Sequence, residues 1–81
     1  MNIKVLGTGC TNCKNLEKAV RAAVEELAVN AVVEKEEDIR NIMKYGIMKT
    51  PGLVIDEKVV LSGRIPSAAE LKEIILKNMN Q

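Results

Sequence analysis

The chain has 81 residues, a net charge of +1, and a composition that is 47% hydrophobic and 28% charged. A chain of this length is expected to form one domain, residues 1–81, with a thin core and no room for a large enclosed substrate cavity. It has one aromatic residue and no basic stripe, which argues against nucleic-acid binding. No stretch approaches the ~20 apolar residues that cross a bilayer, so no membrane association is expected.

The first residues run directly into a short apolar segment that ends at Leu6. This segment is too short for the apolar region of a signal peptide, so we expect a cytoplasmic protein. Cysteines in a reducing compartment seldom form structural disulfides. The pair Cys10 and Cys13, separated by two residues, therefore indicates redox chemistry or metal binding.

The first predicted element is a buried strand over Ile3–Leu6, which leads into the Gly-rich segment Gly7-Thr8-Gly9. A helix is expected from Asn12, because apolar residues then recur at the spacing of one helix face. That face consists of Leu16, Ala19, Val20, Ala23, Val24 and Leu27. The two cysteines thus lie between a strand-ending loop and an amphipathic helix.

A second strand is predicted at Ala31–Val33, and a run of charged residues follows it at 34–38. We interpret this run as an exposed turn that becomes the acidic first turn of a helix. The apolar side of that short helix consists of Ile39, Ile42 and Met43. Gly46 is placed to end it.

Two further strands are predicted at Leu53–Ile55 and Lys58–Leu61, close enough in sequence to form a hairpin. A last helix is expected after Ser67, which forms a capping box with Glu70. The order βαβαββα indicates an α/β fold with a four-stranded mixed sheet flanked by helices. The first two strands should be parallel, because a helix connects them, and the last two antiparallel.

The position of Cys10 at the start of a helix has a chemical consequence. The first N–H groups of a helix and its dipole stabilise an anion, so the pKa of Cys10 should lie below the ordinary thiol value of about 8.5. Lys14 adds a second favourable charge. Cys13 lies one turn further on the same face, within reach of a disulfide and more deeply buried. We expect Cys10 to attack a substrate disulfide and Cys13 to resolve the mixed disulfide.

A redox sensor in a partner-binding adaptor is one alternative to a turnover catalyst, and two other interpretations of the pair remain at this point. Gly-x-Gly-Cys-x-x-Cys before an amphipathic helix also resembles the loop of small copper chaperones and heavy-metal-associated domains. Two thiolates bind soft ions such as Cu(I), so Cys10 and Cys13 are the candidate ligands of a copper or zinc delivery module. A buried pair without chemistry is the remaining structural interpretation.

Features downstream favour redox chemistry. The metal-binding domains end on a strand, whereas this chain is expected to end on a helix, and its Pro51 opens a strand where it removes a ladder donor. The chain resembles the small thioredoxin-like, or glutaredoxin-like, redox-active disulfide proteins of archaea and bacteria. The matching stretches are Gly7 to Cys13 with the helix to Leu27, Tyr45 to Ile47, Thr50 to Asp56, and Ser62 to Arg64.

The resemblance implies a minimal thioredoxin fold, without the extra N-terminal strand and helix of ordinary thioredoxins. It implies a dithiol–disulfide oxidoreductase that acts on protein disulfides, is a monomer, and needs no cofactor besides its cysteine pair. A separate reductase or thiol donor would then restore the dithiol. The resemblance also implies that Pro51 is cis and lies against the cysteines, and that the backbone of Thr50 binds an extended substrate. Thr11 and Asn12, between the cysteines, are further candidate substrate contacts.

Several residues depart from the family pattern. Thr11-Asn12 is neither the Gly-Pro of thioredoxins nor the Pro-Tyr of glutaredoxins, which leaves the reduction potential, the substrate and glutathione use open. Lys4 stands where thioredoxins keep a buried acid; we interpret it as a partly exposed strand residue, with a share in proton relay as the alternative. Tyr45 is expected to cover the end of the second helix, and Arg64 to be a surface residue. A groove-lining Tyr45 and an Arg64 that contacts an acidic partner are the alternatives.

Overall fold

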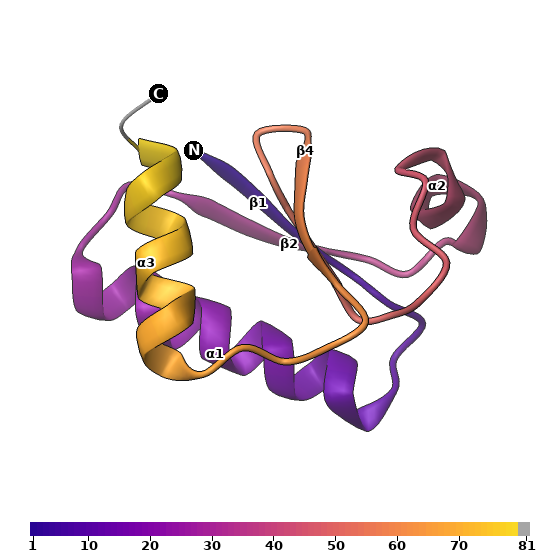
Figure 1. The fold of residues 1–81 in the computed structure, drawn as a ribbon, viewed down its shortest axis with the longest axis horizontal. Helices are drawn as coiled ribbons and strands as arrows, with labels where there is room; N and C mark the ends of the chain where they lie inside the picture. Colours follow the sequence, from indigo (N-terminus) through magenta and orange to yellow (C-terminus); the bar gives the residue numbers. More distant parts are fainter. Residues whose placement is uncertain (80–81) are drawn as a thin grey trace.

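The computed structural model describes residues 1–79, and its elements follow the predicted order βαβαββα (Figure 1). The strands are β1 (Asn2–Leu6), β2 (Val32–Glu36), β3 (Gly52–Ile55) and β4 (Lys58–Ser62). The helices are α1 (Thr11–Leu27), α2 (Ile39–Lys44) and α3 (Ala68–Met79). The predicted fold class is confirmed. Within residues 1–79, no helix is long and apolar enough to cross a membrane.

The four strands form one mixed sheet in the order β2-β1-β3-β4. β1 is parallel to β2 and antiparallel to β3, and β3 is antiparallel to β4. In the β1–β3 ladder, Leu6 at the end of β1 lies opposite Gly52 at the start of β3. The loop after β1 and the chain before β3 are therefore brought to the same edge of the sheet.

Helices cover the two faces of the sheet unequally. Ile3 and Val5 of β1 pack with α1 and α3 in the larger of the two buried clusters. Leu6, one residue further, faces the other way and packs with Ile42 of α2 in the smaller cluster. Figure 1 shows α1 and α3 side by side, with α2 well apart from them. This division follows from strand geometry, because successive side chains point to opposite faces of a sheet.

The second strand differs from its prediction. It spans Val32–Glu36 rather than 31–33, so the first three residues of the charge run belong to a strand and not to a turn. The reason is that β2 is an edge strand: its backbone pairs with β1, while most of its side chains face solvent and carry no apolar alternation. Asp38 alone has the expected helix-start role, since its side chain accepts a hydrogen bond from the Arg40 N–H at 2.9 Å.

The start of α3 confirms the Ser67 half of the predicted capping box, but the Glu70 half is replaced by a contact with Arg64. The Ser67 hydroxyl accepts a hydrogen bond from the Glu70 N–H at 3.2 Å. The Glu70 carboxylate instead accepts hydrogen bonds from both terminal nitrogens of Arg64. This pairing lowers the pKa of Glu70. Arg64 is therefore an exposed residue whose acidic partner lies within the same chain.

Candidate active site

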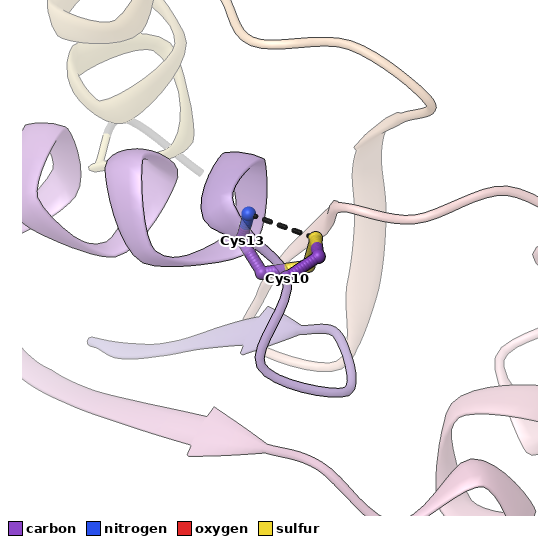
Figure 2. The surroundings of a disulfide bond; sticks show 2 residues. All are labelled: Cys10 and Cys13. Carbon is purple, nitrogen blue, oxygen red and sulfur yellow. Dashed lines mark hydrogen bonds between the residues drawn. A yellow bond between two sulfur atoms is a disulfide. The ribbon is translucent and has the colours of Figure 1, made fainter.

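Cys10 occupies the N-cap of α1, directly after the loop that follows β1. Its sulfur accepts a hydrogen bond from the Cys13 N–H at 3.1 Å, so one helix-end donor already points at the Cys10 Sγ atom (Figure 2). The two cysteines are joined by a disulfide, with their Cα atoms 5.0 Å apart. Cys10 is exposed, whereas Cys13 has only 5% of its surface exposed. The site thus presents one sulfur to solvent and keeps the other beneath it.

Gly7 makes the close approach between the loop and α1 feasible. A Cβ atom at this position would lie 2.8 Å from the Cys13 Cβ atom and would overlap the Cys13 sulfur. Its N–H donates to the Glu36 carbonyl at 3.0 Å, which fixes the backbone in place. In the sequence, Gly7 is recognisable only as part of a loop, because a space requirement between two segments leaves no local sequence signal.

The other predicted site residues gather at the same edge of the sheet. The Thr50–Pro51 peptide bond is cis, and the Pro51 carbonyl accepts a hydrogen bond from the Gly63 N–H at 2.8 Å. Continuing the β1–β3 register by one residue sets Pro51 opposite Gly7, the residue packed against Cys13. Thr50 is exposed and Pro51 is buried. Thr11 and Asn12 form the exposed start of α1.

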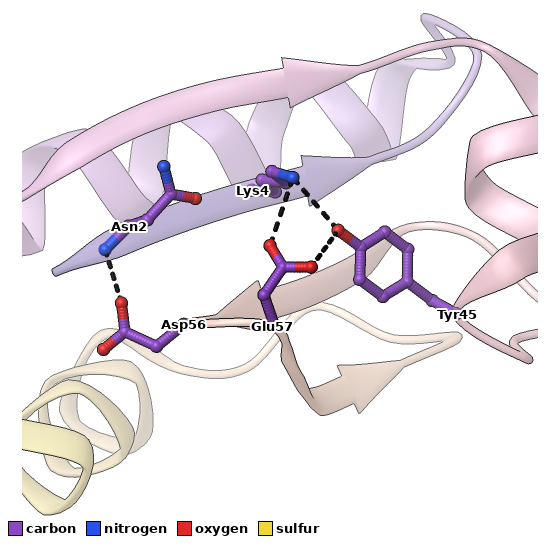
Figure 3. A network of polar contacts seen from close by, with 5 residues as sticks. All are labelled: Asn2, Lys4, Tyr45, Asp56 and Glu57. Atoms are coloured by element: carbon purple, nitrogen blue, oxygen red, sulfur yellow. Dashed lines mark hydrogen bonds and ion pairs between the residues drawn. The ribbon is translucent and has the colours of Figure 1, made fainter.

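Lys4 lies elsewhere, in a polar network on the α2 side of the sheet (Figure 3). Its ammonium donates to the Tyr45 hydroxyl at 3.1 Å and to the Glu57 carboxylate at 3.2 Å. The Tyr45 hydroxyl also donates to Glu57, at 3.2 Å. The hydrogen bond to Tyr45, followed by that to Glu57, raises the pKa of Lys4 above its ordinary value. Tyr45 is the residue at the end of α2 and packs on the smaller cluster, as expected.

Substitution of Lys4 tests whether it takes part in proton transfer. We expect Lys4→Met to leave the pH dependence of disulfide reduction unchanged, because the ammonium is engaged with Tyr45 and Glu57 and faces away from α1. The measurement is the rate of reduction of a small aromatic disulfide across the neutral and alkaline range, with unfolding followed in parallel. A shifted pH profile of disulfide reduction in a fully folded Lys4→Met variant would show that Lys4 takes part in proton transfer.

Similarity to known proteins decides between the interpretations of the cysteine pair. A family model described as a thioredoxin domain matches residues 1–76. The chain belongs to the thioredoxin family. A thioredoxin of Methanothermobacter thermautotrophicus is 41% identical over 75 residues, covering 93% of this chain and 97% of that protein. A thioredoxin of Methanocaldococcus jannaschii is 39% identical over 71 residues, covering 88% of this chain and 81% of that protein. A probable thioredoxin of Archaeoglobus fulgidus is 35% identical over 71 residues.

Family membership and the Cys10–Cys13 disulfide together identify the chain as a thiol–disulfide oxidoreductase. Membership of this family indicates that the protein acts on substrates that contain disulfides and that a reductase is its partner. Within residues 1–79, no group of three or more His, Cys, Asp or Glu side chains is arranged to hold a metal ion.

Proposed function

We propose that Cys10 is the attacking cysteine and Cys13 the resolving cysteine in the reduction of protein disulfides. The observation that carries this assignment is the contrast between the exposed residue Cys10, whose sulfur accepts a hydrogen bond from the Cys13 N–H, and the buried residue Cys13. The reduced Cys10 thiolate attacks one substrate sulfur and forms a mixed disulfide, releasing the other substrate sulfur as a thiolate. Cys13 then attacks Cys10, which releases the second substrate sulfur and leaves the Cys10–Cys13 disulfide.

Substrate binding is assigned to the residues that surround the exposed sulfur. Thr50 is exposed just before the first residues of β3, where its backbone is positioned to pair with an extended segment of substrate. The cis Pro51 holds this part of the chain at the cysteine edge of the sheet. Thr11 and Asn12 supply contacts on the helix side. We further assign the protein to the cytoplasm, as a monomer that a separate reductase or thiol donor returns to the dithiol.

A trapping experiment tests these roles. Cys13→Ser removes the resolving sulfur, so incubation with a disulfide-containing peptide should leave a stable mixed disulfide on Cys10. Mass spectrometry of the intact protein and of its proteolytic fragments measures the adduct and its position. Wild-type protein under the same conditions should show little adduct and instead accumulate the internal disulfide.

The matched variant Cys10→Ser keeps the other cysteine. It is expected to give little adduct, because the remaining sulfur is buried. If Cys10→Ser formed the adduct readily and Cys13→Ser did not, the two roles would be reversed.

A further inference from the structure

An apolar groove lies between α2 and the chain that leads from α2 to Thr50. Its volume is about 280 Å³. The residues that line it are Ile39, Ile42, Met43, Ile47, Met48 and Thr50, of which only the last is polar. Met43 is 67% exposed and Met48 is 98% exposed. Two methionine side chains therefore meet solvent in a groove that reaches the residue to which we assign substrate binding.

The groove continues the surface on which an extended substrate segment is placed. Thr50 belongs both to the groove and to the backbone assigned to pairing with substrate, so a side chain near the substrate disulfide lies at the end of the groove. Exposed apolar residues gathered in one patch are typical of interaction sites, and methionine adapts its shape to different partners. The occupant that fits is an apolar side chain of the protein substrate.

The charges around the groove favour an acidic substrate segment. Every charged residue in the range 39–50 is cationic, namely Arg40, Lys44 and Lys49. Arg40 is paired with Asp38 at 3.5 Å. The Lys49 ammonium, one residue before Thr50, makes no hydrogen bond or ion pair within residues 1–79. A substrate segment with a carboxylate near its apolar side chain would supply a partner for Lys49.

Methionine is also an apolar residue that peroxide converts into a polar one. We propose that Met48, together with Met43, is a site at which hydrogen peroxide oxidises the protein and weakens its binding of protein substrates. The thioether sulfur attacks one peroxide oxygen, and the O–O bond breaks. That oxygen stays on the sulfur as a sulfoxide, while the other leaves as water with both protons. The sulfur loses two electrons, and the peroxide gains them. A sulfoxide in the groove disfavours an apolar occupant, because a polar group buried without a partner costs free energy.

This inference rests on the proposed function, and the chain allows its two kinds of sulfur to be oxidised separately. In the oxidised protein both cysteines are held in the Cys10–Cys13 bond, so neither is a thiolate that reacts with peroxide. Met1 and Met79 line a different pocket, near the start of β1. Met79 is 46% exposed and serves as an internal comparison for Met48.

The test treats the full-length oxidised protein with dilute hydrogen peroxide, removes the peroxide, and restores the cysteines with a dithiol reductant, which leaves sulfoxides in place. Mass spectrometry of proteolytic fragments locates each added oxygen. Two substrates are then compared: an acidic disulfide-containing peptide with a leucine beside its cysteine, and a small aromatic disulfide. We expect kcat/KM for the peptide to fall about 10-fold, the factor that burial of one apolar side chain contributes. The rate with the small disulfide, which does not extend into the groove, should be unchanged.

Three variants serve as controls. The double variant Met43→Leu with Met48→Leu keeps the groove apolar without an oxidisable sulfur, so it should retain peptide reduction after peroxide treatment. Met48→Gln places a polar side chain in the groove and should lower kcat/KM for the peptide without any oxidant. Met79→Leu should lose peptide reduction after peroxide treatment to the same extent as wild type.

Several results would overturn the inference: sulfoxides at Met43 and Met48 that leave peptide reduction unchanged, oxidation of Met79 before either of them, or an equal loss of activity in the double leucine variant. A failure of the proposed function gives a different result. In that case the untreated wild-type protein would show no reduction of either substrate that depends on Cys10.

Discussion

Cys10→Ser is expected to reduce the rate of disulfide reduction to that of the uncatalysed reaction. A serine hydroxyl is not ionised near neutral pH, and the remaining sulfur of Cys13 lies beneath the surface, where a substrate disulfide cannot reach it. The measurement is the reduction of a protein disulfide by a dithiol reductant, with and without catalytic amounts of the variant. The N-cap itself should persist, because serine accepts the same N–H at this position.

The comparison for this prediction is a variant on the same helix. Asn15→Ala alters an exposed residue of α1 outside the cysteine motif and should reduce disulfides at the wild-type rate. Circular dichroism and unfolding of reduced samples establish that both variants fold. Normal activity of a folded Cys10→Ser protein would contradict the assignment of the attacking sulfur.

Gly7→Ala is expected to have the largest effect on stability among single-methyl changes at the site. The added Cβ atom would overlap the Cys13 sulfur and lie 2.8 Å from the Cys13 Cβ atom, which is held by the backbone of α1. Overpacking of this kind costs about 1–3 kcal/mol in the free energy of unfolding. Because the displaced atoms belong to Cys13, the resolving step should slow as well. Urea unfolding of oxidised and reduced protein measures the change in stability. The rate at which the reduced protein releases the second thiol of a chromogenic aromatic disulfide measures the resolving step.

A second glycine separates the clash from a general intolerance of side chains. Gly46 has a φ of +77° and nothing within 4 Å of an added Cβ atom, so Gly46→Ala costs only backbone strain, about 1–2 kcal/mol. That variant should lose some stability and keep the wild-type rate of resolution. A Gly7→Ala protein with unaltered stability and rate would show that the loop accommodates the methyl group by moving.

The helices and the fold class follow from local sequence signals. The apolar stripe from Leu16 to Leu27 predicts α1, and Ser67 with Glu70 marks the start of α3. The sheet topology follows from connection rules, since a helix links the first two strands and a short turn links the last two. The position of Cys10 at a helix start, on which its proposed role rests, is likewise a local property.

The features missed by sequence reasoning depend on contacts between distant segments. Val32–Glu36 forms a strand because β1 pairs with it, although its charged side chains show no strand pattern. Gly7 matters because Cys13 packs against it. Lys4 acquires Tyr45 at the end of α2 and Glu57 in the turn between β3 and β4 as its partners. None of these neighbours is encoded by spacing along the chain.

The unequal covering of the sheet has a consequence for how the protein opens. The face under α1 and α3 has ten buried residues in its cluster, whereas the face under α2 has three, namely Leu6, Ile42 and Val54. Free energies of local opening fall where few apolar contacts hold a segment, so α2 and the chain leading to Thr50 form the least protected unit against amide hydrogen exchange. Cys10 and Cys13 belong to the well-anchored unit. The reacting sulfurs should therefore keep a constant geometry, while the segment to which we assign substrate binding should adapt to partners of different shape.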